Sequence, residues 1–403
     1  MSPEHAACPG RDLRRAPVPA QNSPTANGVS LVFPAQLSEE AAERFRYWSN
    51  ELLETSRYRV QGGYADRVAE LLASSLELPD DWSVMPLRSG TDSLLRALYL
   101  AGVKPGDRVI VPDLAFHAVA ASVLQLGAVP VFADVDALDW NLDPASVALH
   151  LGREARAVIA VDNYGTPADL KTLASLTRAA GAKLILDACE SLGTVYAAGP
   201  PACYADLIVT SFSFTKPIHA AGMGGALCGP REAIAAVKSV PELMCAHFQL
   251  PEINAAYLVA AWPDLPRNIA RLRSIYDRYT ELGAGLGFVG QRESGLSTRI
   301  HAPLLLPEGL GACERDYVIT ELGAAGIASR GYFPSQSVVF GFGGAPPVSA
   351  SIADRVVCLP TGSSMDLFAV DRVCASLSQV ARSAPWALHP PVSGCCQLLP
   401  HRQ

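Results

Sequence analysis

Residues 183–193 read KLILDACESLG, and residues 206–216 read DLIVTSFSFTK. Each stretch contains a short apolar run that is followed by small and polar residues. Four or five apolar residues without polar alternation are typical of a strand that is buried on both faces of a sheet. We therefore expect strands at 183–186 and 206–210, and we expect Asp187 and Lys216 to lie just beyond their carboxyl ends.

Short apolar strands and helices alternate on both sides of these stretches. A Lys-Pro-Gly-Asp turn at 104–107 separates a helix from the next strand, as Pro and Gly favour in tight turns. Further strands are expected at 108–112, 129–133 and 157–161, and helices at 38–53, 64–76, 93–100, 115–126, 167–180 and 255–282. This pattern predicts an α/β fold with a mostly parallel sheet covered by helices on both faces.

The chain has 403 residues, which favours more than one domain. The periodicity changes near residue 285, where smaller strand and helix units begin. We expect a disordered leader at 1–30, an N-terminal arm and large domain at 31–285, a smaller C-terminal α/β domain at 286–383, and a flexible tail at 384–403.

Composition excludes several classes of protein. The chain has 32 basic and 39 acidic residues, a net charge of −7, and no run of Lys or Arg, which argues against nucleic-acid or anionic-membrane partners. It shows neither a signal peptide nor an unbroken membrane-length apolar segment, so we expect a cytoplasmic protein. The ten scattered cysteines form no C-x-x-C pair and the eight histidines show no metal-ligand spacing, so neither disulfides nor a metal are expected.

Two features suit a phosphorylated aromatic ligand. Ser89, Gly90 and Thr91 precede the helix at 93–100, and a helix N-terminus offers free N–H groups and a positive dipole to a phosphate. Phe116 follows the strand at 108–112, where an aromatic ring can stack on a cofactor. The alternatives are an ordinary helix cap and ordinary core packing.

Asp187 and Lys216 are the residues that could take part in a reaction. A carboxylate at the end of a buried strand is costly unless it has a cationic partner, and a protonated pyridine nitrogen would be one. A lysine in an apolar, electropositive site can form a Schiff base. Together with Ser211, whose hydroxyl suits a phosphate, these residues predict a site for pyridoxal phosphate (PLP), an electron sink for amino-group chemistry.

The motifs, taken in order, carry a resemblance that covers residues 38–383. They are SGT at 89–91, VIVP at 109–112, GAVPVFADVD at 127–136, YGTPAD at 164–169, LDACESLG at 186–193 and SFSFTK at 211–216. The chain resembles the DegT/StrS family of fold type I PLP enzymes, which are sugar aminotransferases of deoxysugar and antibiotic pathways. The resemblance implies a homodimer whose active sites take residues from both subunits.

The resemblance also implies roles for single residues. Lys216 would bind PLP covalently and then move the substrate proton, Asp187 would pair with the pyridine nitrogen, and Phe116 would stack on the ring. The cofactor phosphate would be held by residues of two segments: Ser89, Gly90, Thr91 and Ser211.

Some positions depart from the family pattern. Glu190 stands where Gln or His usually approaches the ring hydroxyl, so we expect it either to share a proton with the ring oxygen or to turn toward another cation. His247 replaces an Asn that reaches the phosphate of the partner subunit, and Gln249 replaces an Arg two residues later. Met223 replaces an acidic residue.

The expected reaction moves an amino group from L-glutamate or L-glutamine to a keto sugar, nucleotide-linked, or to a cyclitol. Arg330 is the candidate for the donor carboxylate, with a surface salt bridge as its alternative, and Tyr332 is the candidate sugar contact. Three rival functions stay open: PLP-dependent elimination, a non-catalytic relative, and an NAD-dependent oxidoreductase suggested by the glycines at 222–225. That last loop neither follows the first strand nor opens a helix.

Overall fold

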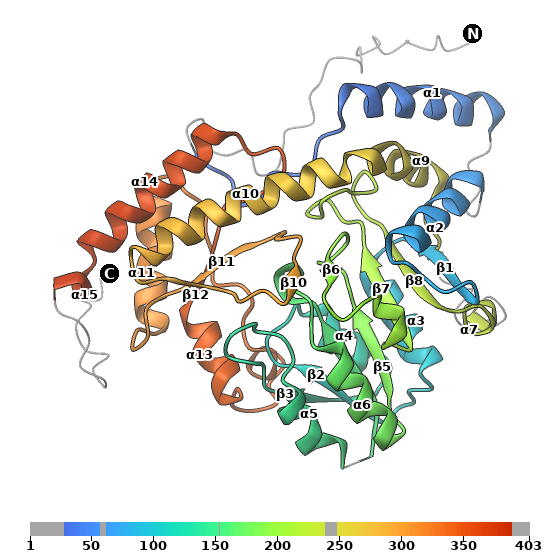
Figure 1. Cartoon of the computed structure of the whole chain (residues 1–403), viewed down its shortest axis with the longest axis horizontal. Coiled ribbons are helices and arrows are strands. Elements are labelled where there is room, and N and C mark those ends of the chain that lie inside the picture. The colour runs from blue at the N-terminus through green and yellow to red at the C-terminus, as the bar shows by residue number, and fades with distance from the viewer. Residues whose placement is uncertain (1–27, 57–61, 153, 238–247, 389–403) are drawn as a thin grey trace, which may run out of the picture.

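The computed structural model describes residues 28–56, 62–152, 154–237 and 248–388 (Figure 1). A seven-stranded sheet forms its centre, in the order β1-β8-β7-β5-β4-β2-β3. Every pairing except those of β8 is parallel. The strands are β1 (Trp82–Leu87), β2 (Arg108–Pro112), β3 (Val129–Ala133), β4 (Ala155–Val161), β5 (Lys183–Asp187), β7 (Leu207–Ser211) and β8 (Gly225–Pro230). The predicted α/β fold with a mostly parallel sheet is confirmed.

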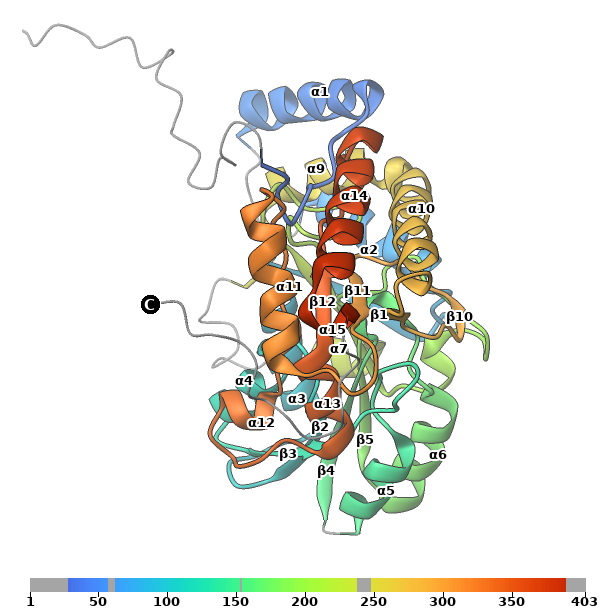
Figure 2. The same cartoon turned by 90° about the vertical axis from the view of Figure 1, so that its left-hand side faces the viewer.

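Helices cover both faces of this sheet, and two separate hydrophobic clusters pack against its two sides. Those from the first part of the chain are α1 (Glu39–Thr55), α2 (Gly63–Ser75), α3 (Gly90–Leu100), α4 (Ala118–Gln125), α5 (Pro144–Leu151), α6 (Leu170–Ala180) and α7 (Arg231–Val237). Ser38 caps α1 as expected, since its hydroxyl accepts a hydrogen bond from the Ala41 N–H at 3.2 Å. Helix α1 lies at one end of the molecule in both views and contacts α9 (Glu252–Ala261) (Figures 1 and 2).

The C-terminal part has its own hydrophobic cluster around a three-stranded antiparallel sheet. Its strands are β9 (Val289–Gly290), β11 (Ala302–Leu305) and β12 (Val356–Leu359), and its helices are α11 (Ala312–Ala324), α12 (Gln336–Val339), α13 (Pro347–Arg355), α14 (Leu367–Ser383) and α15 (Pro385–Leu388). A two-stranded sheet of β6 (Val195–Tyr196) and β10 (Gly295–Leu296) links the two parts. Helix α10 (Leu265–Ala284) crosses both of them along the top of Figure 1.

The expected helix at 255–282 is wrong in one respect. Two helices, α9 and α10, stand there, separated by a 3₁₀ turn at Trp262–Asp264. Pro263 lacks an N–H group, and its ring clashes with the preceding turn of an α-helix, so the helix breaks at this point. The helix expected at 93–100 begins three residues earlier, at Gly90.

Most of the expected leader and tail lie outside the described residues. Within the described part, Val29 is buried and pairs with Ile327, and Phe33 N donates to Thr361 O at 3.0 Å. The segment at 28–33 therefore packs on the C-terminal domain before the chain enters α1. None of the described helices is long and apolar enough to span a bilayer.

Candidate active site

Asp187 and Lys216 meet at the carboxyl edge of two adjacent parallel strands. Asp187 is the last residue of β5, and Lys216 follows the end of β7 by five residues. The segment after β7 is fixed by hydrogen bonds from Phe212 N to Gly224 O (2.8 Å) and from Phe214 N to Gly222 O (2.9 Å). The glycine run at 222–225 thus supports the Lys216 segment and leads into β8, which removes the basis for a dinucleotide-binding loop.

Asp187 is a buried carboxylate in need of a cation. Its side chain accepts the Cys189 N–H at 3.0 Å, but no Lys, Arg or His of the described residues forms an ion pair with it. Burial raises the pKa of this carboxyl, and the charge of nearby Lys216 offsets only part of that effect. A protonated pyridine nitrogen would supply the missing charge, so this residue fits PLP.

The predicted phosphate residues converge from two segments. Ser89 caps α3, and its hydroxyl is engaged twice, accepting from Asp92 N and donating to the Asp92 carboxylate. A Cβ atom added to Gly90 would lie 3.2 Å from Ser211 Cβ and 2.7 Å from Cys189 Sγ, so the start of α3 lies against the end of β7. Gly90 and Ser211 therefore form one cradle at the start of α3, where Thr91 is the next residue, while the Ser89 side chain caps the helix.

Gly225 of β8 lets this cradle form. A Cβ atom at Gly225 would lie 2.4 Å from the carbonyl carbon of Ser89, and backbone cannot yield as a flexible side chain does. We expect Gly225→Ala to cost about 1–3 kcal/mol of unfolding free energy and to weaken PLP binding, because the start of α3 must move. Urea denaturation and a fluorescence titration with PLP measure the two effects.

Gly323→Ala in α11 is the matched control, since no heavy atom lies within 4 Å of a Cβ added there. It should leave PLP affinity unchanged and stabilise the helix by ~0.5–1 kcal/mol. Equal PLP affinity in Gly225→Ala and the wild type would contradict the cradle.

Glu190 lies between two basic groups. Its Oε1 atom is 3.0 Å from His301 Nε2 and 3.5 Å from Lys216 Nζ, and its Oε2 atom accepts the Tyr164 N–H at 2.8 Å. Burial by itself would raise the pKa of Glu190, but His301 and Lys216 outweigh it and bring the pKa down to about 2. The Glu190 carboxylate therefore faces two basic side chains of the protein, and its expected relation to the ring oxygen of PLP stays a prediction.

His301 is the site residue that sequence reasoning missed. It comes directly before β11, in the C-terminal domain, 111 residues from its partner Glu190. Metal-ligand spacing is the usual signal for a functional histidine, and no group of metal ligands occurs among the described residues. No local pattern marks a histidine that acts through a distant carboxylate.

Aromatic rings form one wall of the site. Phe116 is 39% exposed, and its ring centroid lies 6.5 Å from that of Tyr332. The Tyr332 ring is also 5.2 Å from the His301 ring, and Arg330 places its guanidinium 4.0 Å from the Tyr332 ring centroid. Tyr164 fixes this wall, because its hydroxyl donates to Tyr332 O at 2.7 Å. Phe116, Arg330 and Tyr332 are therefore brought together near Lys216, although the chain separates them widely.

Three positions that depart from the family pattern have different outcomes. His247 lies outside the described residues. Gln249 pairs with Leu87 in an isolated β-bridge and is half-buried. Met223 is 58% exposed.

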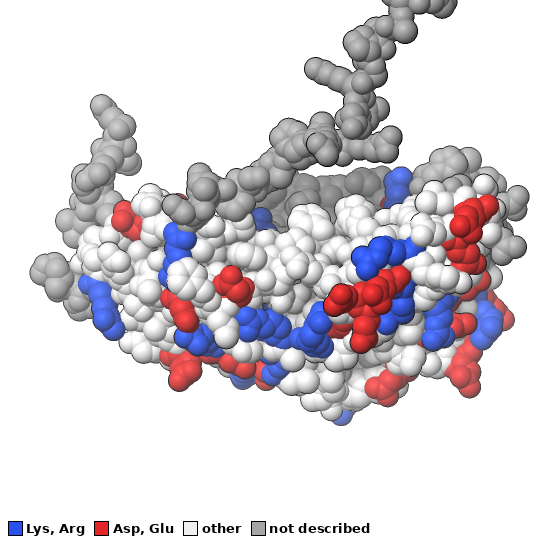
Figure 3. Space-filling model, turned by 90° about the horizontal axis from the view of Figure 1, so that it is seen from above, with Lys and Arg blue, Asp and Glu red and all other residues white. Residues whose placement is uncertain are grey.

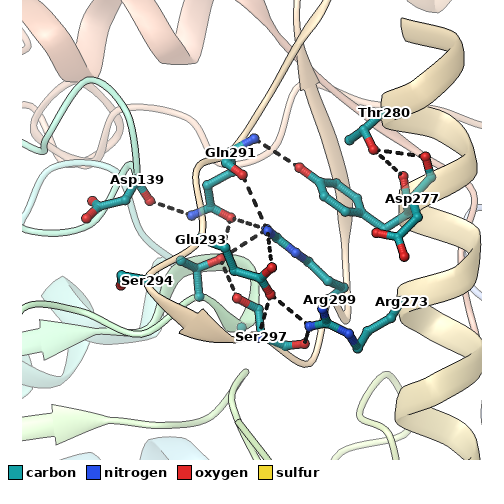
Figure 4. Close-up of polar contacts among 12 residues, drawn as sticks. Asp139, Arg273, Asp277, Thr280, Gln291, Glu293, Ser294, Ser297 and Arg299 are labelled. Atoms are coloured by element: carbon teal, nitrogen blue, oxygen red, sulfur yellow. Dashed lines mark hydrogen bonds and ion pairs between the residues drawn. The ribbon is translucent and has the colours of Figure 1, made fainter. Parts of the chain in front are cut away.

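A buried network holds the segment that carries His301 (Figure 4). Arg299 donates at 3.1 Å both to Gln291 Oε1 and to Thr166 Oγ1, and its guanidinium lies 4.3 Å from the Tyr276 ring centroid. Arg299 comes two residues before His301 in the chain. Its side chain contacts both α10 and the loop after β4. The position of His301 is thus fixed by contacts of Arg299 with residues from three segments of the chain.

Comparison with known proteins identifies the family. The model of the DegT/DnrJ/EryC1/StrS aminotransferase family matches residues 40–378. The chain is 31% identical over 289 residues to a UDP-N-acetyl-3-dehydro-alpha-D-glucosamine 3-aminotransferase of Acidithiobacillus ferrooxidans, which covers 68% of this chain and 77% of that protein. It is 30% identical over 288 residues to the L-glutamine:2-deoxy-scyllo-inosose aminotransferase of Streptomyces lividus, covering 64% and 68%.

A solved structure shows the same arrangement. The crystal structure of DesI in the presence of its TDP-sugar product superposes with a TM-score of 0.80 at 25% identity, covering 90% of this chain and 95% of that one. With the family match over most of the chain, this shows that the chain belongs to the DegT/DnrJ/EryC1/StrS aminotransferase family and is a PLP-dependent aminotransferase.

Proposed function

We propose that this enzyme transfers an amino group from L-glutamate or L-glutamine to the ketone of a nucleotide-linked sugar, with a keto cyclitol as the second candidate. The similarity to the Acidithiobacillus enzyme and to DesI, whose names include UDP- and TDP-linked compounds, supports the first substrate class. The similarity to the Streptomyces lividus enzyme supports the second class, and its name gives L-glutamine as donor.

The observation that carries the proposal is that Asp187 and Lys216 lie at the ends of two adjacent parallel strands, with Phe116, Tyr332 and Arg330 in one wall that reaches Lys216 through His301 and Glu190. PLP supplies the electron sink through which an amino group leaves the donor and reaches the ketone. In our proposal Asp187 keeps the ring nitrogen protonated, and the cradle of Gly90, Thr91 and Ser211 binds the phosphate. Phe116 supports the ring, and Lys216 carries PLP and moves the substrate proton.

Elimination is the weaker reading. A donor amino acid and a bulky ketone must occupy one site in turn, and the donor carboxylate needs a cation. Arg330 is exposed, stacks on Tyr332 and forms no ion pair among the described residues, so it can bind a carboxylate at the mouth of the site. This favours a reaction with a free amino acid as one of its substrates.

The direct test of the reaction is product analysis. The enzyme is incubated with PLP, L-glutamate or L-glutamine, and a panel of keto compounds that contains UDP-linked, TDP-linked and cyclitol members. Mass spectrometry should find one keto compound converted to its amine together with the matching 2-oxo acid. Release of ammonia and a 2-oxo acid without an aminated product would support elimination instead.

Arg330→Gln tests the carboxylate contact. Loss of a charge-assisted hydrogen bond of about 1.5–3 kcal/mol should raise the KM for the amino donor roughly 10- to 100-fold, with a much smaller effect on the KM for the keto compound. Arg355→Gln in the same domain is the control, because Arg355 bonds only backbone carbonyls. If Arg330→Gln and the wild type have equal KM values for the amino donor, Arg330 does not bind the donor carboxylate and has a structural role instead.

The cellular location and the oligomeric state are also proposals, and they rest on the resemblance to the family. We propose a cytoplasmic homodimer in which His247 reaches the cofactor phosphate of the partner subunit, and sedimentation of the PLP-loaded protein tests the dimer. Acidic and basic side chains are interspersed on the face seen in Figure 3, so this face has no single-sign surface for a polyanion.

A further inference from the structure

Lys216, Glu190 and His301 form a buried trio in which the Glu190 carboxylate lies between two basic side chains. The side chains of all three are at most 10% exposed. A buried ion pair is expensive to desolvate, and it is retained at low cost only where further hydrogen bonds satisfy its members. Glu190 meets this condition, since Oε1 contacts both basic groups and Oε2 accepts the Tyr164 N–H.

The segment of His301 is built to face Glu190. Thr298 donates from its hydroxyl to the backbone carbonyl of Glu190 at 2.7 Å, and Arg299 is locked into the network of Figure 4. His301 then reaches the carboxylate of the same residue whose carbonyl Thr298 holds. Residues 298–301 therefore contact both the backbone carbonyl and the side-chain carboxylate of Glu190.

Several other groups surround the trio. Asp187 follows from β5 and adds negative charge, and the Tyr332 hydroxyl is held neutral because burial and Glu190 raise its pKa. Cys189 and Cys358 are also kept as neutral thiols, because burial raises their pKa values. Glu190 and His301 are therefore the charge-bearing neighbours that contact each other next to Lys216, and Arg330 lies farther out, over the Tyr332 ring.

We propose that Glu190 and His301 are positioning residues that act as one unit: the Glu190 carboxylate contacts the Lys216 nitrogen and keeps it aimed at the cofactor site, both when the lysine is joined to PLP and when it is free, and His301 holds the carboxylate in place. The proposal rests on Lys216 as the PLP-bearing lysine, but it does not depend on the identity of the keto substrate. It assigns a function to His301 and explains why a carboxylate works at position 190.

The test is a pH titration of the visible absorbance of the PLP-loaded protein, in the wild type, Glu190→Gln, His301→Gln and the double variant. A unit charge within about 4–6 Å shifts a titration by roughly one to three pH units. Glu190→Gln removes a negative charge and should lower the midpoint by about one pH unit. His301→Gln removes the imidazole that contacts the carboxylate at 3.0 Å, so the charge of Glu190 acts more strongly on the Lys216 nitrogen and the midpoint should rise. The double variant should match Glu190→Gln, because His301 acts through the carboxylate.

Stability of the cofactor-free protein gives a second readout. His301→Gln leaves a buried carboxylate without its nearest basic partner and should lower the melting temperature most, whereas the double variant should recover part of the loss. Glu252→Gln is the matched control, since Glu252 is equally buried and caps the N-terminus of α2. It should not move the absorbance midpoint.

The possible results distinguish three claims: the role of Glu190 and His301, the assignment of Lys216, and the proposed substrate. Loss of stability with unmoved absorbance midpoints would make the pair purely structural and overturn the proposal, as would an additive effect of the two substitutions. If borohydride fixes PLP to a lysine other than Lys216, the assignment of Lys216 itself fails. Failure to aminate any keto compound, with the midpoint shifts intact, would overturn the proposed substrate and leave this inference standing.

Discussion

Replacing Lys216 by arginine should stop turnover almost completely while leaving the protein folded. Arginine keeps a cation beside Glu190, so the buried carboxylate is still compensated. A guanidinium is always protonated, so it can neither bond to PLP nor move the substrate proton. We expect the rate of amino transfer to fall by about 10⁴-fold, and we expect PLP to be removed from the variant by gel filtration.

Lys183→Arg provides the matched control. Lys183 starts the same strand that Asp187 ends, pairs with Asp206 at 2.8 Å and lies at the opposite edge of the sheet. This variant should keep both the rate and the cofactor. A Lys216→Arg enzyme that retains more than a few per cent of wild-type activity would show that another lysine carries the chemistry.

Asp187→Asn should separate catalysis from stability. Asparagine keeps the acceptor for the Cys189 N–H, but it cannot hold a proton on the pyridine nitrogen, so the electron sink is weakened. We expect the rate of amino transfer to fall by about 10²–10³-fold, the usual cost of removing one preorganised electrostatic contact. Steady-state kinetics at saturating PLP measures this loss.

The cofactor-free Asp187→Asn protein should be at least as stable as the wild type at pH 7. Burial raises the pKa of Asp187 above its ordinary value of 3.8, so the folded state binds this proton more tightly than the unfolded state does. The stability that this proton provides is present below the unfolded pKa and is lost as pH rises through the folded pKa. The advantage of the variant should therefore be visible at pH 7 and shrink toward pH 4 in urea denaturation.

Asp206→Asn is the matched control, and its effects on stability and rate should be the opposite of those of Asp187→Asn. Asp206 binds Lys183 and the Leu184 N–H far from the site, so its loss should reduce stability slightly and leave the rate unchanged. An Asp187→Asn enzyme with the wild-type rate would remove Asp187 from the reaction. A large loss of stability without PLP would mean that the carboxylate is satisfied by the protein alone.

The parts of the fold that depend on local pattern could be predicted from the sequence. The buried runs of β2 and β3 have the predicted bounds, and those of β5 and β7 differ by one residue, because continuous apolar runs bounded by turns are a strong strand signal. Strands β1 and β8 were not predicted. Pro86 interrupts the pattern of β1 and Gly229 that of β8, and β8 is stabilised by antiparallel pairing with β1 and β7 rather than by its own sequence.

The residues of the candidate site also fall into those that a local sequence pattern predicts and those that it does not. Asp187 and Lys216 could be found because one ends a predictable strand and the other follows such a strand by five residues, and parallel strands bring such residues to one edge. The contact of Glu190 with His301 could not be found, because it joins two segments that lie 111 residues apart in the chain. The packing of Gly225 against Ser89 likewise joins distant segments, and no local pattern encodes it.

Borohydride reduction of the PLP-loaded wild-type enzyme, followed by proteolysis and mass spectrometry, tests the central claim most directly. Borohydride fixes PLP to the lysine that carries it, and the peptide that contains Lys216 should hold the added mass, with the Lys183 peptide unmodified in the same digest. Prior incubation with L-glutamate or L-glutamine should abolish the label, because the donor amino group releases the lysine. A label on any other lysine, or a Lys216 label that neither donor removes, would contradict the account.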